Sequence, residues 1–316
     1  MNATARRAAA FLAAGTIAAA HASPFAYVSN EGSNSISVID IGDEDAVAAT
    51  LQAGSKPRGI AVSLDGSRLY VSEQTAGAVL VYDPSSGKRL ARAAVGASPE
   101  GLYLSGDGKR LAVAVEENDV VAIVDAATMQ VVKKIPIHGK NPEHAVWSPD
   151  GRWIYASAEN TDAVDIIDVA RGEVVKSLTV GNRPRGIAFL PDGSRAYVAA
   201  ENANLVSVID VAKQEVVARI PASLRSNGVV VHPDGKRVYV SSGGKGTVQV
   251  IDVETNRIVG EVAVGERPWN MAITPDGRRL YVACGRSNAV AVVGTASFTK
   301  LKEIAVGRLP WGVAIR

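Results

Sequence analysis

Cysteine, aromatic residues and long apolar runs are all scarce in this sequence. Its one cysteine, Cys284, cannot form a disulfide within the chain, so packing and hydrogen bonds must hold the fold. Phe, Trp and Tyr together make up 5% of the residues, and the one long apolar run stands at the start of the chain. No later segment is long and apolar enough for a membrane-spanning helix, so we expect no membrane span. The absence of a CxxCH sequence excludes covalently attached c-type haem, and neither a nucleophile elbow nor a Gly-rich phosphate loop occurs.

The first 22 residues differ in composition from everything that follows. Arg6 and Arg7 precede an apolar stretch from residue 8 to residue 20, and Ala20-His21-Ala22 has the form of a cleavage site. This pattern is typical of a secretory signal peptide. We therefore expect residues 1–22 to be removed near Ala22-Ser23, and residues 23–316 to form a single exported domain.

Positive and negative charges balance in the expected mature chain. The sequence has 34 Lys and Arg residues, two of which lie in the predicted signal peptide, and 32 Asp and Glu residues, all outside it. Binding to a phosphate backbone depends on clustered Lys and Arg side chains. A neutral chain without a basic run therefore argues against nucleic acid as the main partner.

An Asp-Gly pair recurs along the chain at an almost constant interval. Successive pairs are separated by 42, 43, 42, 42 and 42 residues. The pairs are Asp65-Gly66, Asp107-Gly108, Asp150-Gly151, Asp192-Gly193, Asp234-Gly235 and Asp276-Gly277. A fixed period in this range indicates stacked or radially arranged supersecondary units.

Each unit contains four short apolar runs that are joined by turns. In the first complete unit the runs cover residues 59–62, 69–71, 78–82 and 90–95, and Asp65-Gly66 lies between the first two. An Asp-Gly pair favours a hairpin because Gly adopts positive φ without a Cβ clash. Connections this short require antiparallel pairing, since a parallel crossover needs a dozen or more residues. Each unit is therefore predicted to be a four-stranded antiparallel sheet.

Seven such units predict an all-β fold, a seven-bladed β-propeller. The innermost strand of each unit starts with Pro, or in one unit with Ser. These starts are Pro57, Pro99, Pro142, Pro184, Ser226, Pro268 and Pro310. The last unit contains one strand only, and residues 25–53 supply three more at the other end of the chain. We therefore expect both ends to share the seventh blade, which closes the ring and covers the sheet edges.

Positions at which the units differ are the candidates for function, because positions common to most units serve the architecture. The variable positions lie in two loops per unit, one before the innermost strand and one between the second and third strands, and both open on one face. Carboxylates and arginines gather there, which suits a binding site built on loops of a rigid scaffold. The predicted ligand- or partner-binding residues are Arg58, Arg185, Arg267, Glu116, Glu159, Glu201, Asn270, Trp269 and Trp311. A solvated surface of mutual ion pairs is the alternative interpretation.

Trp269 and Trp311 hold the same position in neighbouring units, where the other units have Arg, Glu or Asn. Two aromatic side chains beside Arg267 and Arg308 suit a flat anionic ligand or a protein hot spot. The alternative is that they cover the seam at which the ring closes.

His138 and His144 flank one loop of the same face and are the candidate metal ligands. His144 replaces the Gly found in most units, and Glu100 and Glu143 are expected nearby. Imidazole and carboxylate groups suit a metal ion or haem iron, although the sequence offers no third clear ligand.

The motifs Tyr-Val-Ser-Asn at residues 27–30 and Tyr-Val-Ser-Glu at residues 70–73 recur as Tyr-Val-Ala-Ala at 197–200 and Tyr-Val-Ser-Ser at 239–242. With the Val-Ile-Asp strands that follow, they resemble the YVTN-type β-propeller repeat family over residues 25–316. The closing Arg-Leu-Pro-Trp-Gly-Val-Ala-Ile segment makes the chain similar to secreted propellers associated with catabolism that depends on pyrroloquinoline quinone (PQQ). This resemblance implies a periplasmic protein that works beside quinoprotein alcohol dehydrogenases and c-type cytochromes.

We predict a non-catalytic periplasmic propeller that binds a protein partner or a small ligand on its loop face. The candidate partners are a quinoprotein dehydrogenase and a c-type cytochrome, and the candidate cofactors are PQQ, a metal ion and haem. Related propellers suggest two alternatives. One is a lactonase-type hydrolase that uses Glu100, Glu143 or His144, and the other is a metal- or haem-binding carrier.

Overall fold

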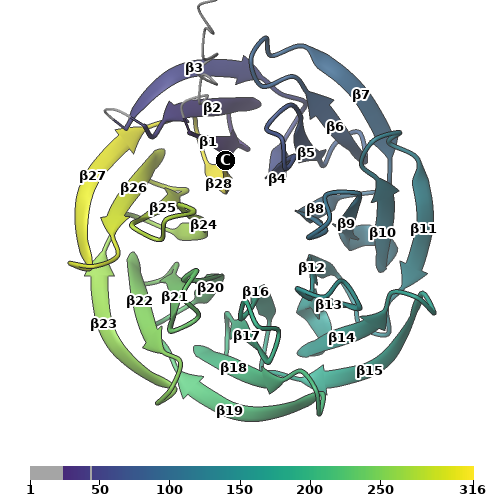
Figure 1. The fold of residues 1–316 in the computed structure, drawn as a ribbon, viewed down its shortest axis with the longest axis vertical. Helices are drawn as coiled ribbons and strands as arrows, with labels where there is room; N and C mark the ends of the chain where they lie inside the picture. Colours follow the sequence, from purple (N-terminus) through teal and green to yellow (C-terminus); the bar gives the residue numbers. More distant parts are fainter. Residues whose placement is uncertain (1–23, 43–44) are drawn as a thin grey trace, which may run out of the picture.

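Seven four-stranded antiparallel sheets surround a central axis in the computed structural model (Figure 1). The structure describes residues 24–42 and 45–316, so the predicted signal peptide lies outside the described residues. Within the described part, the only helical elements are the 3-10 turns η1 (Glu116–Asn118) and η2 (Glu159–Thr161), and no helix there could cross a membrane. The predicted all-β, seven-bladed propeller is confirmed.

Each blade takes the name of its innermost strand, and its strands follow the chain from the axis outwards. The β4 blade has β4 (Pro57–Val62), β5 (Leu69–Glu73), β6 (Ala78–Tyr82) and β7 (Arg89–Ala94); the β8 blade has β8 (Pro99–Leu104), β9 (Arg110–Val115), β10 (Val120–Asp125) and β11 (Val131–Pro136); the β12 blade has β12 (Pro142–Trp147), β13 (Trp153–Ala158), β14 (Ala163–Asp168) and β15 (Glu173–Thr179); the β16 blade has β16 (Pro184–Phe189), β17 (Arg195–Ala200), β18 (Leu205–Asp210) and β19 (Glu215–Pro221). The β20 blade has β20 (Ser226–Val231), β21 (Arg237–Ser242), β22 (Thr247–Asp252) and β23 (Arg257–Ala263); the β24 blade has β24 (Pro268–Ile273), β25 (Arg279–Cys284), β26 (Ala289–Gly294) and β27 (Thr299–Ala305).

The seventh blade joins the two ends of the chain. Its innermost strand β28 (Pro310–Ile315) pairs with β1 (Phe25–Asn30), which continues into β2 (Ser35–Asp40) and β3 (Ala46–Gln52). The pairing is antiparallel, and Phe25 and Arg316 exchange backbone hydrogen bonds of 2.9 and 3.0 Å. In Figure 1, β28 and β1 lie side by side although they come from opposite ends of the sequence. The shared blade predicted from the sequence therefore closes the ring.

The recurring Asp-Gly pairs form the turns between the first and second strands, as predicted. Gly66 has a φ of +75°, and the Asp65 carboxylate accepts hydrogen bonds from Ser63 Oγ (2.6 Å) and Ser67 N (3.0 Å). These bonds, with that from Ser63 the largest contribution, hold the pKa of Asp65 well below its usual range. The turns lie on one face of the ring, which we call the turn face. The opposite face, where the innermost strands begin, is the mouth face.

Large apolar side chains fill the space between neighbouring sheets. Tyr155 of β13 is fully buried and packs edge-on against Phe189 of β16, with ring centroids 4.8 Å apart. Tyr197, Tyr239 and Tyr281 are buried in the same way, as expected for a recurring packing residue. Cys284 is also buried, and its burial raises the pKa of the thiol to about 12, so it is a packing residue.

The serine of the Tyr-Val-Ser motif links neighbouring blades at the axis. Ser72 Oγ accepts a hydrogen bond from Gly59 N (2.7 Å) in its own blade and donates one to Glu100 O (2.6 Å) in the next. A Cβ atom at Gly59 would lie 2.5 Å from the same Glu100 oxygen. Glycine is therefore required at this position, because the backbone of the next blade approaches too closely for a side chain.

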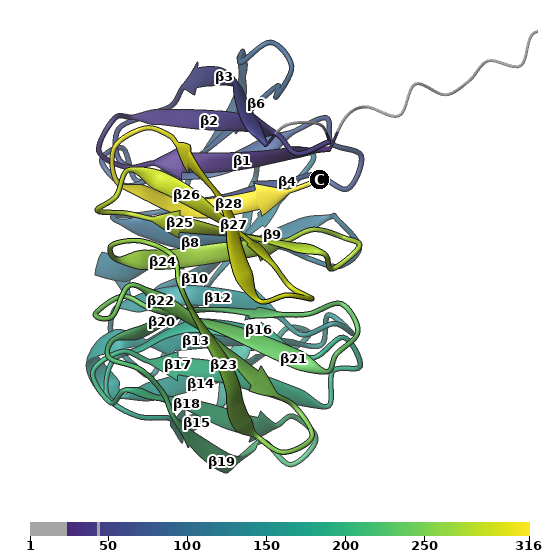
Figure 2. The same ribbon diagram turned by 90° about the vertical axis from the view of Figure 1, so that its left-hand side faces the viewer.

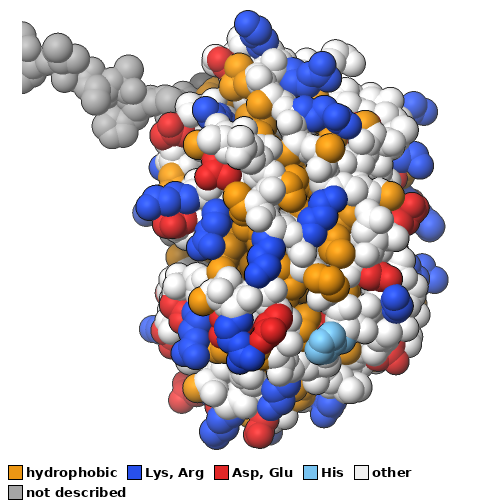
Figure 3. Space-filling view, turned by 90° about the vertical axis from the view of Figure 1, so that its right-hand side faces the viewer, with side chains coloured by type: hydrophobic (Ala, Val, Ile, Leu, Met, Phe, Trp, Pro, Cys, Tyr) orange, Lys and Arg blue, Asp and Glu red, His pale blue; other side chains and the backbone are white. Residues whose placement is uncertain are grey.

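The outer wall of the ring is formed by the fourth strands, which cross it obliquely in Figure 2. Six of these strands expose a large aliphatic side chain. These residues are Val47, Leu90, Val132, Val217, Val259 and Leu301. Figure 3 shows one side of the wall, where apolar side chains are interspersed with Lys and Arg. Since the feature repeats around the ring, it belongs to the architecture.

Candidate functional site

Two successive positions at the start of each innermost strand differ strongly between blades. The first carries Arg58, Glu100, Glu143, Arg185, Asn227, Trp269 and Trp311. The second is Gly in five blades, but His144 in the β12 blade and Asn270 in the β24 blade. The side chains of both positions meet near the axis, on the side of the mouth face.

Charged side chains at the mouth face form a buried group that we call the mouth cluster. Its members are Glu31, Glu100, Glu143, Glu159, Glu201, Arg58, Arg183, Arg185 and Arg267. Arg185 is 10% exposed and lies 2.5 Å from Glu143, 3.2 Å from Glu159 and 2.8 Å from Glu201. The arginines are thus already paired with carboxylates from several blades.

Arg58 and Arg267 extend this cluster on either side. Arg58 contacts Glu100 at 2.6 Å and Glu31 at 3.2 Å, and Arg267 contacts Glu201 at 2.7 Å. Because burying an unpaired charge is costly, the mutual pairing explains how so many charges are buried together. A ligand at the mouth would have to displace these existing ion pairs.

The two adjacent carboxyl groups of Glu100 and Glu143 have pKa values shifted in opposite directions. Burial, together with the neighbouring Glu143 carboxylate, raises the pKa of Glu100 to about 8 despite the attraction of Arg58. Burial also opposes ionisation of Glu143, but the nearby Arg185 and Arg58 outweigh it and hold its pKa below the ordinary value. The neighbouring carboxyl groups therefore differ in acidity, Glu100 being the weaker acid and Glu143 the stronger.

Trp311, His144 and Tyr103 form what we call the axial stack. His144 lies against the Trp311 indole with ring centroids 5.7 Å apart and 15° between the ring planes. Its Nδ1 lies 2.6 Å from the Tyr103 hydroxyl, and its Nε2 is buried without a hydrogen-bond partner among the described residues. Burial lowers the pKa of His144 to about 4, so the imidazole is neutral. Since β28 and β12 lie on opposite sides of the axis (Figure 1), the stack crosses the channel.

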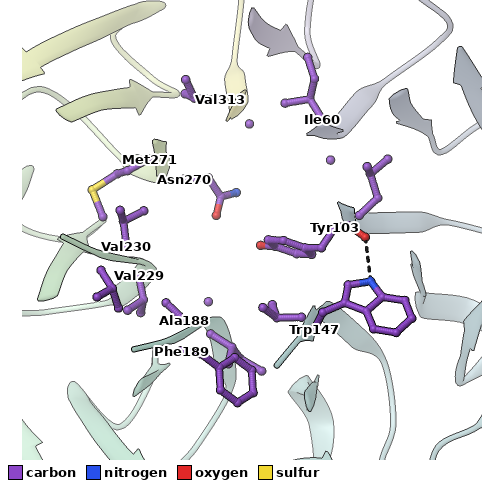
Figure 4. A pocket seen from close by; sticks show the side chains of 18 of the residues that line it. Ile60, Tyr103, Trp147, Ala188, Phe189, Val229, Val230, Asn270, Met271 and Val313 are labelled. Atoms are coloured by element: carbon purple, nitrogen blue, oxygen red, sulfur yellow. Dashed lines mark hydrogen bonds between the residues drawn. The ribbon is translucent and has the colours of Figure 1, made fainter. Parts of the chain in front are cut away.

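An axial cavity of about 380 Å³ adjoins this stack. All seven innermost strands line it, mostly with Gly, Ala, Val, Ile and Leu, and no charged side chain of the described residues is among its lining. Tyr103 and Asn270 point toward its centre, whereas the Trp147 indole turns away and donates to Tyr103 O at 3.1 Å (Figure 4). The described residues form no hydrogen bond to the Asn270 carboxamide, which leaves its donor and acceptor free for a ligand. Small pockets with few, well-placed polar groups are typical of ligand sites.

The structure separates residues that the sequence placed together. Trp311 is buried in the axial stack, whereas Trp269 is half-buried beside Arg267, whose guanidinium lies 6.0 Å from the Trp269 ring. Glu116 lies at the edge of the mouth face and accepts a hydrogen bond from Ser98 Oγ at 2.9 Å. The predicted mouth residues therefore divide between the mouth cluster, the axial stack and the cavity, and Trp269 and Glu116 lie outside all three.

The two candidate metal ligands are not brought together. His144 is buried in the axial stack, while the ring of His138 is exposed and lies 3.4 Å from Ser177 Oγ. Within residues 24–42 and 45–316, no group of three or more His, Cys, Asp or Glu side chains is arranged to hold a metal ion. The described residues therefore provide no metal site built on this pair.

Tyr103 is the site residue that the sequence analysis missed. It stands at a position where the other blades have only Ala or Val. These counterparts are Ala61, Val146, Ala188, Val230, Ala272 and Ala314. The signal was therefore present as one large residue among six small ones.

Comparisons with known proteins agree with the fold. The family model described as "Lactonase, 7-bladed beta-propeller" matches residues 2–94 and 173–305, more than half of the chain. The model of the cytochrome D1 haem domain matches residues 106–228. Among curated proteins, none matches the chain.

Several solved structures share the architecture over nearly the whole chain. A chain of hydrazine synthase from Kuenenia stuttgartiensis is 25% identical, with a TM-score of 0.79, and the match covers 89% of this chain and 99% of that one. A Bacteroides uniformis protein assigned as a 6-phosphogluconolactonase is 20% identical, with a TM-score of 0.79 over 93% of this chain and 100% of that one. The dihydro-haem d1 dehydrogenase NirN is 18% identical, with a TM-score of 0.68 over 92% and 74%. The latter two likenesses concern the fold alone.

Proposed function

We propose that this chain, which belongs to the lactonase family of seven-bladed β-propellers, is a ligand-binding propeller whose axial cavity holds one small, uncharged molecule. The observation that carries the proposal is the cavity itself, with an apolar wall and two inward-pointing polar side chains, Tyr103 and Asn270 (Figure 4). Its volume of about 380 Å³ falls in the range of small-molecule sites.

The lining of the cavity favours a neutral ligand over an ion. No charged side chain of the described residues lines it, and a charge transferred from water into such surroundings without a partner is strongly disfavoured. Asn270 offers both a donor and an acceptor, and the Tyr103 hydroxyl is held by the neutral His144. We therefore favour a ligand with an apolar body and one or two carbonyl or hydroxyl groups.

A thermal-shift screen of residues 23–316 against neutral lactones and quinones tests this proposal. A ligand at a hundred times its dissociation constant stabilises the native state by about 2.7 kcal/mol. The Asn270→Ala variant should reduce the shift for the same ligand, because it removes both hydrogen-bonding groups. If the two proteins respond equally to every compound that binds, the ligand lies elsewhere and the proposal fails.

We also propose the cellular compartment in which the protein acts and the proteins beside which it acts. We propose that the protein acts in the periplasm, beside a quinoprotein dehydrogenase or a c-type cytochrome, on the basis of its N-terminal sequence and the repeat resemblance. PQQ carries several carboxylates, so it does not suit the uncharged axial cavity, and the association would be between proteins. Cell fractionation and co-purification of the native protein test this: cytoplasmic retention, or the absence of either partner class, would refute it.

Lactone hydrolysis is a second candidate function, favoured by the adjacent Glu100 and Glu143 carboxyl groups, whose pKa values are shifted in opposite directions. Such a split pair suits general acid–base catalysis. The Glu143 carboxylate would take a proton from the water that attacks the carbonyl carbon. Glu100 would give its proton to the ring oxygen as the bond between that oxygen and the carbonyl carbon breaks. Both groups are buried, so neighbouring side chains would have to move before a substrate could reach them. Turnover of a simple aldonolactone above the spontaneous rate, lost in Glu100→Gln, would support this function, and no turnover would exclude that substrate class.

A further inference from the structure

The mouth face contains two grooves between blades that share one backbone plan. One lies between the β4 and β8 blades, with a volume of about 660 Å³, and the other between the β20 and β24 blades, with about 600 Å³. Gly77 and Gly96 of the first groove correspond in the repeat to Gly246 and Gly265 of the second. The two grooves therefore have equivalent backbones but carry different side chains.

The β20/β24 groove is the more cationic of the two. Four cationic side chains line it against one carboxylate: Lys245, Arg267, Arg286 and Lys300 against Glu266. In the β4/β8 groove, two lysines face one carboxylate: Lys56 and Lys134 against Glu117. Ser98 and Glu117 occupy the repeat positions of Arg267 and Arg286. The positive charge of the β20/β24 groove therefore comes from its particular side chains, and the repeat architecture does not require it.

Two guanidinium groups of the β20/β24 groove have unused hydrogen-bond donors. Arg267 uses Nη2 to contact Glu201 at 2.7 Å, but its Nη1 is buried without a partner among the described residues. The exposed Arg286 side chain forms no hydrogen bond or ion pair within the described part of the chain. A buried donor left unpaired costs free energy, so an acceptor from outside the chain would stabilise this arrangement.

The unpaired donor of Arg267 lies beside a position at which two earlier blades carry a carboxylate. Gly243 stands at the repeat position occupied by Glu159 and Glu201 in earlier blades. A Cβ atom built on Gly243 would lie 2.9 Å from Arg267 Nη1, so the Arg267 guanidinium packs against this residue only because it is glycine. The acidic side chain that would have neutralised Arg267 is thus absent, and Nη1 is left without an acceptor among the described residues.

We propose that the β20/β24 groove is a binding site for a small molecule that carries an oxyanion, either a carboxylate or a phosphate. The exposed Arg286 guanidinium binds the oxyanion through charge-assisted hydrogen bonds, which are among the strongest that proteins form, and the Arg267 guanidinium turns its unpaired Nη1 toward it. Lys245 and Lys300, held by Glu261 and Glu303 at 2.8 and 2.9 Å, add positive potential at the rim. The site shares no lining residue with the axial cavity, so the two binding proposals can be tested independently of each other.

Calorimetric titration of residues 23–316 with inorganic phosphate and with succinate, at constant ionic strength, tests the site. The wild type should bind at least one of the two anions at one site per chain. The Arg286→Glu variant, which restores the acidic residue of the matched groove, should bind at least tenfold more weakly. Arg286 is exposed, so this substitution leaves the core untouched.

The β4/β8 groove provides the control. Lys56→Gln removes a cation from that groove and should leave the affinity unchanged. A preference for phosphate over succinate would assign the ligand to phosphate esters, and the reverse preference to carboxylates. The proposal is overturned if neither anion binds with a dissociation constant below about 10 mM. It is also overturned if Arg286→Glu binds the anion with an affinity within twofold of the wild type.

Discussion

His144 and Trp311 lie face to face across the central axis, with their ring centroids 5.7 Å apart and 15° between their planes. They come from strands separated by three blades, and each occupies one of the two variable positions at the start of its innermost strand. Trp311 also adjoins both of the regions described above, since its ring lies 5.9 Å from the Arg58 guanidinium of the mouth cluster and lines the axial cavity.

Truncation of Trp311 tests how much this contact contributes to the stability of the fold. Trp311→Ala should lower the free energy of unfolding by about 3–5 kcal/mol, as is usual when a buried aromatic side chain is removed. Trp269→Ala is the matched control at the same repeat position, and it should cost clearly less because Trp269 is only half-buried. Urea denaturation of both variants measures the difference. Equal costs would contradict the placement of Trp311 in the core of the ring.

The links between blades predict different outcomes for two neighbouring serines. Ser241 Oγ accepts from Gly228 N at 2.8 Å and donates to Trp269 O at 2.6 Å in the next blade. Ser242 is equally buried, but its hydroxyl has no partner among the described residues. Ser241→Ala should therefore destabilise the protein by about 1–3 kcal/mol, and Ser242→Ala should be neutral or stabilising. Similar unfolding free energies for the two variants would refute the linking role of Ser241.

The buried carboxyl group of Glu100 predicts a specific pH dependence of stability. Its pKa is raised from 4.5 to about 8 in the folded protein, so the folded state keeps this proton where the unfolded chain has lost it. The contribution is fully present below pH 4.5 and is lost as the pH rises through 8. The difference in melting temperature between the wild type and Glu100→Gln should therefore shift against the wild type across this window. Parallel profiles from pH 5 to pH 9 would show that Glu100 titrates normally.

The blades and their closure could be predicted from the sequence because both depend on local patterns. Asp65-Gly66 and its repeats specify hairpins, and the single strand after Pro310 leaves the ring open unless β1 pairs with it. The role of Ser72 in joining blades was hidden, since its second partner, Glu100 O, is a backbone atom of another unit.

The candidate site could be predicted only in part, because repeat position does not reveal which side chains meet. The sequence showed that Arg185 and Glu201 gather on one face, but not that they would pair and bury each other. It placed Trp269 and Trp311 in equivalent positions, yet only Trp311 finds a flat partner, because only the β12 blade carries a histidine where most blades have glycine. Contacts across the axis depend on the closed ring, which no single repeat encodes.

Fluorescence titration with N-phenyl-1-naphthylamine, a neutral and largely apolar probe, shows whether the axial cavity binds a small uncharged ligand. Ala188 lines the axial cavity at the repeat position of Tyr103, so Ala188→Tyr should fill the cavity with a side chain that the fold already accepts there. Ala48→Tyr, on the exposed outer strand β3, is the control. We expect saturable binding at one site per chain in the wild type and the control, and its loss in Ala188→Tyr. Failure of the probe to bind the wild type, or undiminished binding to Ala188→Tyr, would contradict this expectation.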